Sequence, residues 1–434
     1  MLPIISVNRP AEKVKQINYD AHLNPLVSQL PLTSCEVCVI VPVRNEAFNL
    51  EATLLALTNQ INLEGKELDK NRYEIIILAN NCTDNSAEVA RRFAQTQPNL
   101  VLHVVEMTLN NDRAHIGWVR KILMDEAYRR FKAIGRNFGV IASTDGDTRV
   151  ASTWIAATLA EIKNGADAVG GRIITNNQER SKLNKNTRLY YLRHLRYGYL
   201  TSQLESYLDP DFESLPRHHH HYAASLAVTA QMYAQVGGLP PLRSSEDVAL
   251  YDALKRADAR FRHSPMVRVI TSARAIGRVE AGLSNRLSQL NVMAQKHQSI
   301  LVESAELVAI RFCLRRWLRY LWQNRQHMPQ SNFLIELAII AQKLNINSDL
   351  LTETLWRSPT FGLVVEEIGQ YQQDNNNLDL ACQKVTIQQA NADLRNTINR
   401  ISHLGNRSML EQSQSLSLGT FKQIKPISLV PQPL

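Results

Sequence analysis

Two carboxylates separated by one residue follow a buried apolar run near the middle of the chain. Asp145 and Asp147, with Gly146 between them, come directly after Phe138-Gly139-Val140-Ile141-Ala142. Mg²⁺ and Mn²⁺ prefer hard oxygen ligands, and Mg²⁺ is typically held by one or two carboxylates together with substrate phosphates. Ligands of open α/β sheets bind beyond the carboxyl ends of the strands. The sequence therefore predicts a divalent-cation site for a phosphorylated ligand; a plain Asp-Gly-Asp turn is the alternative.

Three further polar segments lie where strands are predicted to end or where a later helix begins. They are Pro42-Val43-Arg44-Asn45-Glu46, Asn80-Asn81-Cys82-Thr83-Asp84 and Ser244-Ser245-Glu246-Asp247. Because the carboxyl ends of parallel strands share one edge of a sheet, we expect the first two segments beside Asp145 and Asp147. Helix starts at that edge also offer free N–H groups to a phosphate. For Asp84 and Ser245, capping of a helix is favoured over ligand contact.

A regular alternation of strands and helices predicts how these segments are positioned. Apolar runs typical of strands lie at 36–41, 73–79, 100–105, 138–142 and 168–174. Helical spacing follows at 46–60 and 116–134, the second closed by Gly135. The succession indicates an α/β fold with a doubly wound, mostly parallel sheet flanked by helices. Helical patterns then continue from 283 to about 392.

The composition indicates a large folded core and an anionic ligand. With 434 residues, 44% of them hydrophobic, the chain is long enough for two domains. Its net charge of +9 favours anionic ligands, but no nucleic-acid-binding signature accompanies the charge, so no nucleic-acid partner is expected.

The five cysteines are few and scattered, which indicates a reducing compartment. Cys35 and Cys38 have C-x-x-C spacing but enter an apolar run, and we interpret them as core residues.

The chain carries no apolar run of about 18 residues and no signal peptide, so we expect a cytoplasmic protein. The segment 310–322 mixes arginines with aromatic residues. It predicts either a helix lying on an anionic membrane surface or a helix packed on the rest of the protein with its arginines in water. Peripheral contact with an anionic membrane therefore stays open.

Four motifs, in this order, resemble those of family 2 glycosyltransferases with the GT-A fold. They are Pro42-Val43-Arg44-Asn45-Glu46, Asn81-Cys82-Thr83-Asp84, Asp145-Gly146-Asp147 and Glu246-Asp247. The resemblance covers 36 to about 280. It implies a hexosyltransferase-like enzyme that moves a sugar from a nucleotide-sugar donor, expected to be a UDP- or GDP-sugar, to an unknown acceptor hydroxyl. It also implies inversion at the anomeric carbon and a Mn²⁺ or Mg²⁺ cofactor.

The same resemblance assigns particular side chains to the nucleotide. Pro42, Arg44 and Glu46 are expected to line its pocket, together with Asn80 and Asn81. Many family members carry consecutive aspartates where this chain has the two asparagines. Because of this difference, the resemblance does not define how the base of the nucleotide is contacted.

Four acidic residues are assigned to the reaction by the resemblance. Asp145 is expected near the ribose and the metal, and Asp147 as the direct metal ligand. Asp247 is expected to be the general base that deprotonates the acceptor hydroxyl, a role that typically contributes a factor of about 10² to 10⁴ in rate. Its neighbour Glu246 is expected to position the acceptor or to support Asp247.

Several basic segments have two interpretations each. Arg274 and Arg278 are expected to touch the diphosphate or an anionic acceptor, or else to be solvated loop charges. The run His218-His219-His220-His221 is a candidate to reach the metal or the acceptor, against an ordinary place in a loop. His263 is separately a candidate for a third metal ligand. The segment Gly117-Trp118-Val119-Arg120-Lys121 starts the long helix and is a candidate to hold the donor's sugar or phosphates.

The chain departs from processive synthases, because Cys313 stands at the Gln position of a Gln-x-x-Arg-Trp signature that ends in Arg316-Trp317. Two alternatives to an inverting transferase remain. One is a retaining GT-A transferase for a small phosphorylated or glycerate-type acceptor, and the other is a non-catalytic scaffold that binds nucleotide sugar. The expected parts are an N-terminal extension at 1–35, a GT-A glycosyltransferase domain at 36–282, a helical region at 283–395 and a flexible tail at 396–434.

Overall fold

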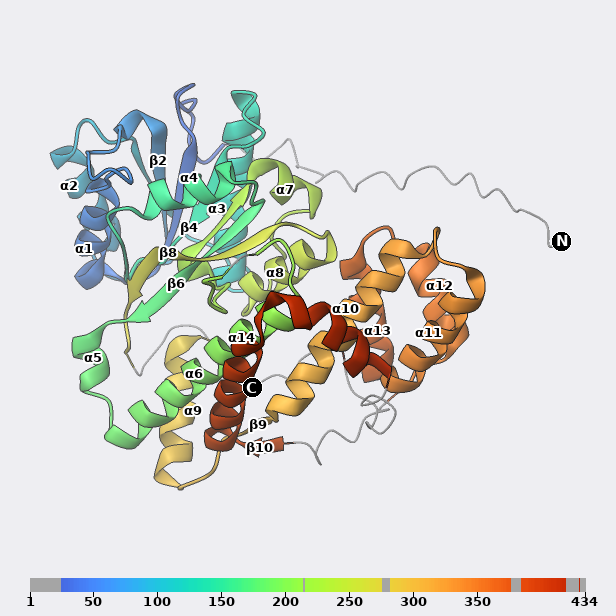
Figure 1. Cartoon of the computed structure of the whole chain (residues 1–434). Helices are drawn as coiled ribbons and strands as arrows, with labels where there is room; N and C mark the ends of the chain where they lie inside the picture. The colour runs from blue at the N-terminus through green and yellow to red at the C-terminus, as the bar shows by residue number, and fades with distance from the viewer. Residues whose placement is uncertain (1–24, 214, 275–281, 376–383, 419–428, 430–434) are drawn as a thin grey trace. The chain divides into compact units, whose positions relative to one another are not determined.

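The computed structural model describes residues 25–213, 215–274, 282–375, 384–418 and 429, with only the backbone for 403–418. The chain divides into two compact units, whose helices and strands carry their labels in Figure 1 where there is room. Unit 1 comprises Met1–Ile162 and Ala223–Ala253, and unit 2 comprises Lys163–Tyr222 and Leu254–Leu434. Each unit therefore combines segments that are distant in the sequence.

Unit 1 is built on five strands in the order β3-β2-β1-β4-β7. Parallel pairing joins β1 to β2 and β4, and β2 to β3, whereas β7 runs antiparallel to β4. All residues of β1, β2 and β4 are buried, as expected for strands covered on both faces. The strands are β1 (Val37–Val43), β2 (Tyr73–Asn80), β3 (Leu102–Met107), β4 (Val140–Ser143) and β7 (Leu226–Thr229).

The helices of unit 1 follow the predicted alternation. They are α1 (Ala47–Thr58), α2 (Ser86–Thr96), α3 (Ile116–Ala133), α4 (Trp154–Lys163), α7 (Ala230–Gln235) and α8 (Glu246–Arg256), with α4 and α8 ending just across the unit boundary. Short pieces complete the unit: η1 (Lys70–Arg72), η2 (Ala223–Ser225) and β5 (Thr148–Val150). The long helix α3 stops where predicted, because Gly135 adopts the left-handed conformation, φ +68°, that favours glycine after a helix.

Unit 2 combines a parallel strand pair with a largely helical remainder. The pair is β6 (Ala168–Thr175) and β8 (Phe261–Thr271). Its helices are α5 (Asn177–Ser181), α6 (Lys185–Leu208), α9 (Leu283–Gln295), α10 (Ala305–Asn324), α11 (Gln330–Leu344), α12 (Ser348–Arg357), α13 (Phe361–Asp374) and α14 (Ile387–Leu418). A small antiparallel pair joins β9 (Leu301–Glu303) to β10 (Lys384–Thr386).

Two apolar clusters hold the helices of unit 2 together. One cluster includes Leu318, Leu337, Leu351 and Val364, and thus joins α10, α11, α12 and α13. The second includes Leu204, Leu290, Phe312 and Leu394, and joins α6, α9, α10 and α14. Helix α10 contributes to both and is therefore the central helix of this part.

The predicted α/β class, the mostly parallel sheet with flanking helices and the helical C-terminal region are confirmed. The structure adds features that the sequence pattern did not indicate, namely β5, the antiparallel direction of β7 and the β9–β10 pair. The predicted boundary at 282 does not coincide with the division into units, and the predicted parts stay predictions. Helix α14 continues to Leu418, inside the segment expected to be a tail. None of the helices in the described ranges is long and apolar enough to cross a membrane.

Candidate active site

The turn that leads from β1 into α1 is bound by the loop after β2. Asp84 Oδ2 accepts a hydrogen bond from the first N–H of α1, at Ala47 (3.0 Å), and its Oδ1 accepts one from Ser86 N–H (3.0 Å). These are the free N–H groups that a helix start leaves unsatisfied. Asp84 therefore caps a helix, as predicted. It accepts from the first N–H group of α2, the helix that follows it, and also from the first N–H group of α1.

Further hydrogen bonds fasten the first two motifs to each other. Thr83 N–H donates to Asn45 Oδ1 (2.7 Å), and Asn45 Nδ2 donates to Thr83 Oγ1 (3.1 Å). Asn45 has a φ of +55°, which reverses the chain and which asparagine tolerates better than most residues. Glu46 N–H donates to Ser86 Oγ (2.7 Å). The two motifs therefore lie side by side at the carboxyl edge of β1 and β2, as expected.

The residues expected around the nucleotide lie at this edge and differ in burial and in hydrogen bonding. Pro42 and Asn80 are buried within β1 and at the end of β2, whereas Arg44 is exposed and donates to Ala114 O (2.9 Å). Asn81 Nδ2 donates to Leu109 O (2.9 Å), and its Oδ1 accepts from Leu109 N–H (3.1 Å). The amide of Asn81 therefore fastens the end of β2 to the loop after β3.

The Asp145-Gly146-Asp147 turn lies against α1 and against Glu46, the residue that precedes it. Thr148 N–H donates to Asp145 O (3.1 Å), which closes the turn, and Thr53 of α1 donates from Oγ1 to Gly146 O (3.0 Å). A Cβ added at Gly146 would lie 3.3 Å from the Glu46 side chain. Glycine at this position lets the turn approach the first motif closely, so the first and third motifs are neighbours.

Arg120 of α3 joins the third motif to the fourth. Its side chain is 5% exposed and donates from Nε to Glu246 Oε1 (3.0 Å) and from one terminal nitrogen to Asp145 Oδ1 (3.0 Å). The other terminal nitrogen donates to Ser143 Oγ at the end of β4 (2.7 Å). The planar guanidinium has five N–H donors in a fixed fork, so it holds both carboxylates in one arrangement.

Arg120 was not singled out from the sequence, where it stood only within the basic start of the long helix. Burial by itself lowers the pKa of Arg120, but Asp145, Glu246 and Asp247 outweigh burial and raise that pKa above its ordinary value. Burial raises the pKa of Glu246, and Asp247 adds to the effect, against the opposing charge of Arg120. The centre of this cluster is therefore a permanent cation among three acids.

Asp247 is held by backbone N–H groups. Its Oδ2 accepts from Ala223 N–H (2.8 Å) in η2, and its Oδ1 accepts from Val248 N–H (2.8 Å). The same η2 segment accepts from Thr144, whose Oγ1 donates to Ala224 O (3.0 Å) directly before the Asp145 turn. A second connection, independent of Arg120, thus brings Asp247 to the third motif. Each carboxylate oxygen keeps a lone pair for another donor.

Asp145 and Asp147 fit a divalent cation. The Asp145 side chain is 34% exposed, and Asp147 is partly exposed. Within the described part of the chain, no group of three or more His, Cys, Asp or Glu side chains is placed to hold a metal ion alone. Two carboxylates completed by substrate phosphates are a ligand set that Mg²⁺ typically uses. The turn thus suits an ion that binds together with a phosphorylated ligand.

The histidine run and His263 lie in unit 2, where they contact each other and nearby backbone. Ile173 N–H donates to His220 Nδ1 (3.0 Å), and His220 N–H donates to His218 Nδ1 (3.0 Å). His263 Nδ1 lies 2.8 Å from Glu213 Oε2. Burial lowers the pKa of His218 to about 2 and that of His220 to about 3, so both rings are neutral near pH 7. These contacts give the run a structural role, and a role toward a metal or an acceptor stays a prediction.

The remaining basic candidates also belong to unit 2. Arg274 is partly exposed and follows β8, and Arg278 lies outside the described residues. In α10, Arg311 pairs with Glu303, and both Arg315 and Arg319 pair with Asp209. The segment 310–322 is therefore a packed helix, but its paired arginines differ from the expectation that they lie in water.

The cysteine pair is part of the core of unit 1. Cys35 and Cys38 are buried free thiols. Burial raises the pKa of Cys35 to about 12 and raises that of Cys38 as well. Neither thiol forms the reactive thiolate near neutral pH, which agrees with the structural interpretation.

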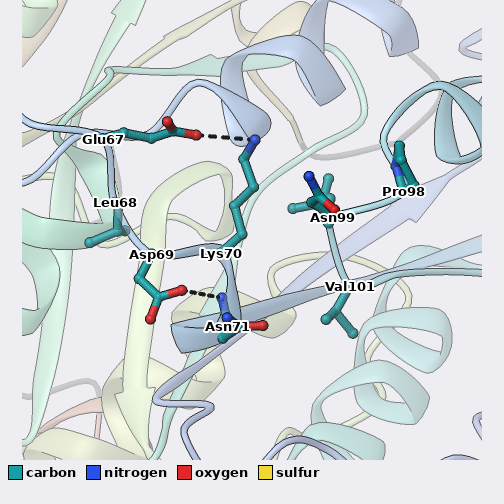
Figure 2. Close-up of a pocket in the computed structure, with 9 residues that line it drawn as sticks. Glu67, Leu68, Asp69, Lys70, Asn71, Pro98, Asn99 and Val101 are labelled. Atoms are coloured by element: carbon teal, nitrogen blue, oxygen red, sulfur yellow. Dashed lines mark hydrogen bonds and ion pairs between the residues drawn. The ribbon is translucent and has the colours of Figure 1, made fainter.

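A hollow of about 630 Å³ lies away from these motifs (Figure 2). It is lined by residues around η1, such as Glu67 and Lys70, and by the segment that precedes β3, including Pro98 and Val101. These residues precede β2 and β3, so the hollow lies at the amino edge of the strands, opposite the four motifs. Glu67 and Lys70 form an ion pair at its rim (3.2 Å).

A comparison with known protein families agrees with the first three motifs. Residues 38–214 match the model of the family "Glycosyl transferase family 2". This segment contains the first three motifs, and Glu246-Asp247 lies beyond its end. The family resemblance inferred from the motifs is thereby confirmed for this part of the chain.

A curated relative is "Glycosyltransferase AglE" of Haloferax volcanii, 28% identical over 156 residues. The match covers 34% of this chain and 41% of the relative, so the chain spans less than half of that protein.

Among solved structures, the mannosyltransferase PcManGT from Pyrobaculum calidifontis, in complex with GDP-Man and Mn²⁺, is 15% identical with a TM-score of 0.39. The match covers 92% of this chain and 90% of the mannosyltransferase chain. TarS residues 1–349 of S. aureus, in complex with UDP-GlcNAc, are 14% identical with a TM-score of 0.40, covering 78% and 92%. At these TM-scores the two structures define no shared site.

Proposed function

We propose that this chain is a metal-dependent glycosyltransferase that moves a sugar from a nucleotide-diphosphate sugar to an acceptor hydroxyl, with inversion at the anomeric carbon. The family match of residues 38–214 supports the reaction class. The observation that carries the proposal is Arg120, which holds Asp145 and Glu246 together and so places the acid pair of the third motif next to Asp247. Donor and acceptor chemistry must meet within a few ångströms, and this cluster provides that proximity.

The donor half of the proposed site is the edge formed by the first three motifs. Pro42, Arg44 and Glu46, with Asn80 and Asn81, are proposed to surround the nucleoside of a UDP- or GDP-sugar. Arg44 is the most adaptable of these residues, because it is exposed and held by a single carbonyl.

The diphosphate of the donor is proposed to lie at the third motif. Asp147, with Asp145, would hold Mn²⁺ or Mg²⁺, and a bound ion of this kind stabilises the charge of a departing diphosphate. Arg120 is a positioning residue here, because it fixes Oδ1 of Asp145 by a charge-assisted hydrogen bond.

The acceptor half of the proposed site centres on Asp247. The acceptor hydroxyl oxygen forms the new bond to the anomeric carbon while the bond from that carbon to the diphosphate breaks. The leaving diphosphate takes the electron pair, and the hydroxyl proton passes to the Asp247 carboxylate. The N–H groups of Ala223 and Val248 hold this carboxylate in place. Glu246 is proposed to act through Arg120, because it is buried and bonded to it.

The cellular setting of the reaction is a further part of the proposal. Four cysteines in the described ranges are free thiols, namely Cys35, Cys38, Cys82 and Cys313. Free thiols are usual where the cell keeps thiols reduced, which supports action in the cytoplasm.

Donor turnover tests the proposal. Purified protein is incubated with UDP- and GDP-sugars, Mn²⁺ and a panel of hydroxyl acceptors, and the anomeric configuration of any product is read by NMR. The proposal predicts transfer with inversion, and loss of transfer in both Asp147→Asn and Asp247→Asn. Glu51→Gln, at an exposed position of α1, is the matched control and should retain activity.

Each contrary outcome has a defined meaning. A product with retained configuration, together with an active Asp247→Asn variant, would replace the proposal with a retaining transferase. Nucleotide-sugar binding without transfer or hydrolysis in any combination would favour a non-catalytic scaffold.

A further inference from the structure

Helix α6 of unit 2 presents an exposed face that combines basic and apolar side chains. The face consists of Lys185, Leu189, Leu192, Arg196 and Tyr199, whose spacing of four, three, four and three residues places them along one side of the helix. The three apolar members are 43%, 44% and 47% exposed. We name these five residues the α6 face.

The opposite side of α6 is part of the core. Thr187, Tyr191, Tyr197, Leu200 and Leu204 are buried. They face α9, α10 and α14, which pack against α6 (Figure 1). The helix is therefore held rigidly by unit 2, and its exposed face is a fixed surface rather than a detachable segment.

The surface around the α6 face carries positive charge only. Between 180 and 203 the chain carries six basic residues and no acidic residue. Lys185 and Arg196, and the flanking Lys182, Arg188 and Arg193, form no ion pair with any residue that the structure describes. Three arginines of α10, by contrast, are paired with carboxylates, so the α6 surface is basic without an internal partner among the described residues.

The composition of the face restricts what it fits. A second copy of the chain docked on the same face would bring like charges together, which is unfavourable. A nucleic-acid strand would satisfy the basic residues, but proteins that bind single strands usually stack bases on several aromatic rings, and this face offers a single ring, that of Tyr199. Basic side chains beside exposed leucines and a tyrosine are the combination found where helices meet a lipid bilayer surface.

We propose that the α6 face docks this protein on the surface of an anionic lipid bilayer. Lys185 and Arg196 contact lipid phosphates, and Leu189 and Leu192 enter the boundary between headgroups and acyl chains. Tyr199 suits the same boundary, because its ring is apolar and its hydroxyl is polar. The proposal concerns a surface on unit 2 and does not depend on the reaction proposed for unit 1.

Vesicle co-sedimentation tests the proposal with the full chain. Vesicles of phosphatidylcholine alone are compared with vesicles that also contain phosphatidylglycerol, at low and high salt. We expect binding to the anionic vesicles only, and weaker binding at high salt, because salt screens exposed charges. Each basic residue near an anionic surface contributes roughly fivefold in affinity, so Lys185→Gln with Arg196→Gln should weaken binding by about 25-fold.

A matched control removes the same charge elsewhere. Lys132→Gln with Lys163→Gln replaces two exposed lysines at the ends of α3 and α4 and should leave binding within about twofold, because neither lysine belongs to the α6 face. Leu189→Ser with Leu192→Ser tests the apolar part, and we expect binding to fall while the salt dependence persists. Thermal unfolding of all variants shows whether they are folded.

Several results would overturn the proposal. These are absence of binding to anionic vesicles, equal binding to phosphatidylcholine alone, or equal loss in the α6 and control variants. A single-stranded oligonucleotide provides a parallel arm. If it binds in a way that requires Lys185 and Arg196 while vesicles do not bind, the face takes a nucleic acid and the membrane proposal is wrong.

Discussion

Two buried arginines of the same helix, Arg120 and Arg130, are used in different ways. They lie nearly three turns apart in α3, at opposite edges of the strands of unit 1. Arg130 forms a two-pronged ion pair with Glu74 near the start of β2, with contacts of 2.7 and 2.5 Å, and also donates to Gln29 O (2.6 Å). Both side chains of this pair are at most 2% exposed.

Arg120 also donates to a buried acid, Glu246, but its other acidic partner, Asp145, is 34% exposed. In the Arg130–Glu74 pair both side chains are buried, so neither can contact a ligand. Arg120, in contrast, orients Asp145, a carboxylate that a ligand in solvent can reach. Burial of an ion pair is therefore no sign of function by itself. The informative feature is a partner that remains accessible at the carboxyl edge of the strands.

The largest effect is expected at Arg120, where stability and the rate of transfer should respond differently to removal of the buried acid Glu246. Arg120→Met alone leaves Glu246 unpaired and should lower the free energy of unfolding by about 3 to 5 kcal/mol. Adding Glu246→Gln should restore much of that stability, because no buried charge is then unpaired. Transfer should stay about 10²- to 10³-fold reduced, the usual effect of removing one preorganised donor in an active site. Denaturant unfolding and steady-state kinetics measure the two effects; recovery of both together would make Arg120 merely structural.

Arg130 should show the reverse behaviour. Arg130→Met should lower the free energy of unfolding by about 3 to 5 kcal/mol, since it leaves Glu74 charged and buried. Turnover per folded molecule should be unchanged, and Arg130→Met with Glu74→Leu should regain stability. A loss of turnover in the stable double variant would show that the two arginines are not functionally distinct.

The Arg130–Glu74 pair should also make stability depend on pH. Burial opposes ionisation of Glu74, but hydrogen bonds from Arg130 and His103 lower its pKa from 4.5 to about 2. The native state thus binds the proton less readily than the unfolded chain, so the stabilisation is complete above about pH 4.5 and is lost as the pH falls toward 2. Unfolding of wild type and Glu74→Gln, measured across this range, should converge toward low pH; a constant difference would contradict the assigned pKa.

The smallest effect is expected at Asp84, a polar residue of the same edge that caps a helix. Asp84→Ala removes acceptors for the N–H groups of Ala47 and Ser86, and should cost roughly 0.5 to 2 kcal/mol of stability. The dissociation constant for a nucleoside diphosphate should change by less than about twofold if capping is its whole role. Calorimetric titration of the variant measures that constant, and a large loss of affinity would place Asp84 in the donor pocket.

Much of unit 1 could be predicted from sequence, because its signals are local. Apolar runs defined β1 and β2, and Gly135 marked the end of α3 through a backbone conformation that glycine favours. The edge shared by the first and second motifs followed from the parallel order of the strands. These inferences needed only short-range periodicity and turn chemistry.

The contacts within the site could not be predicted, because they join residues far apart in the chain. Arg120 and Glu246 are separated by 126 residues, and no local pattern distinguishes this arginine from the adjacent Lys121. The amide of Asn81 faces Leu109 rather than open space for the same reason. Periodicity assigns residues to elements, whereas partner choice depends on how distant elements pack.

Calorimetric titration of UDP and GDP into the protein, with and without Mn²⁺, tests the central claim most directly. If Asp145 and Asp147 hold an ion that contacts a diphosphate, wild type should bind one nucleotide tightly only when Mn²⁺ is present. Asp147→Asn should lose the effect of the metal, and Glu51→Gln should keep it. Affinity that is unchanged by Mn²⁺ in wild type, or a full metal effect in Asp147→Asn, would contradict the account.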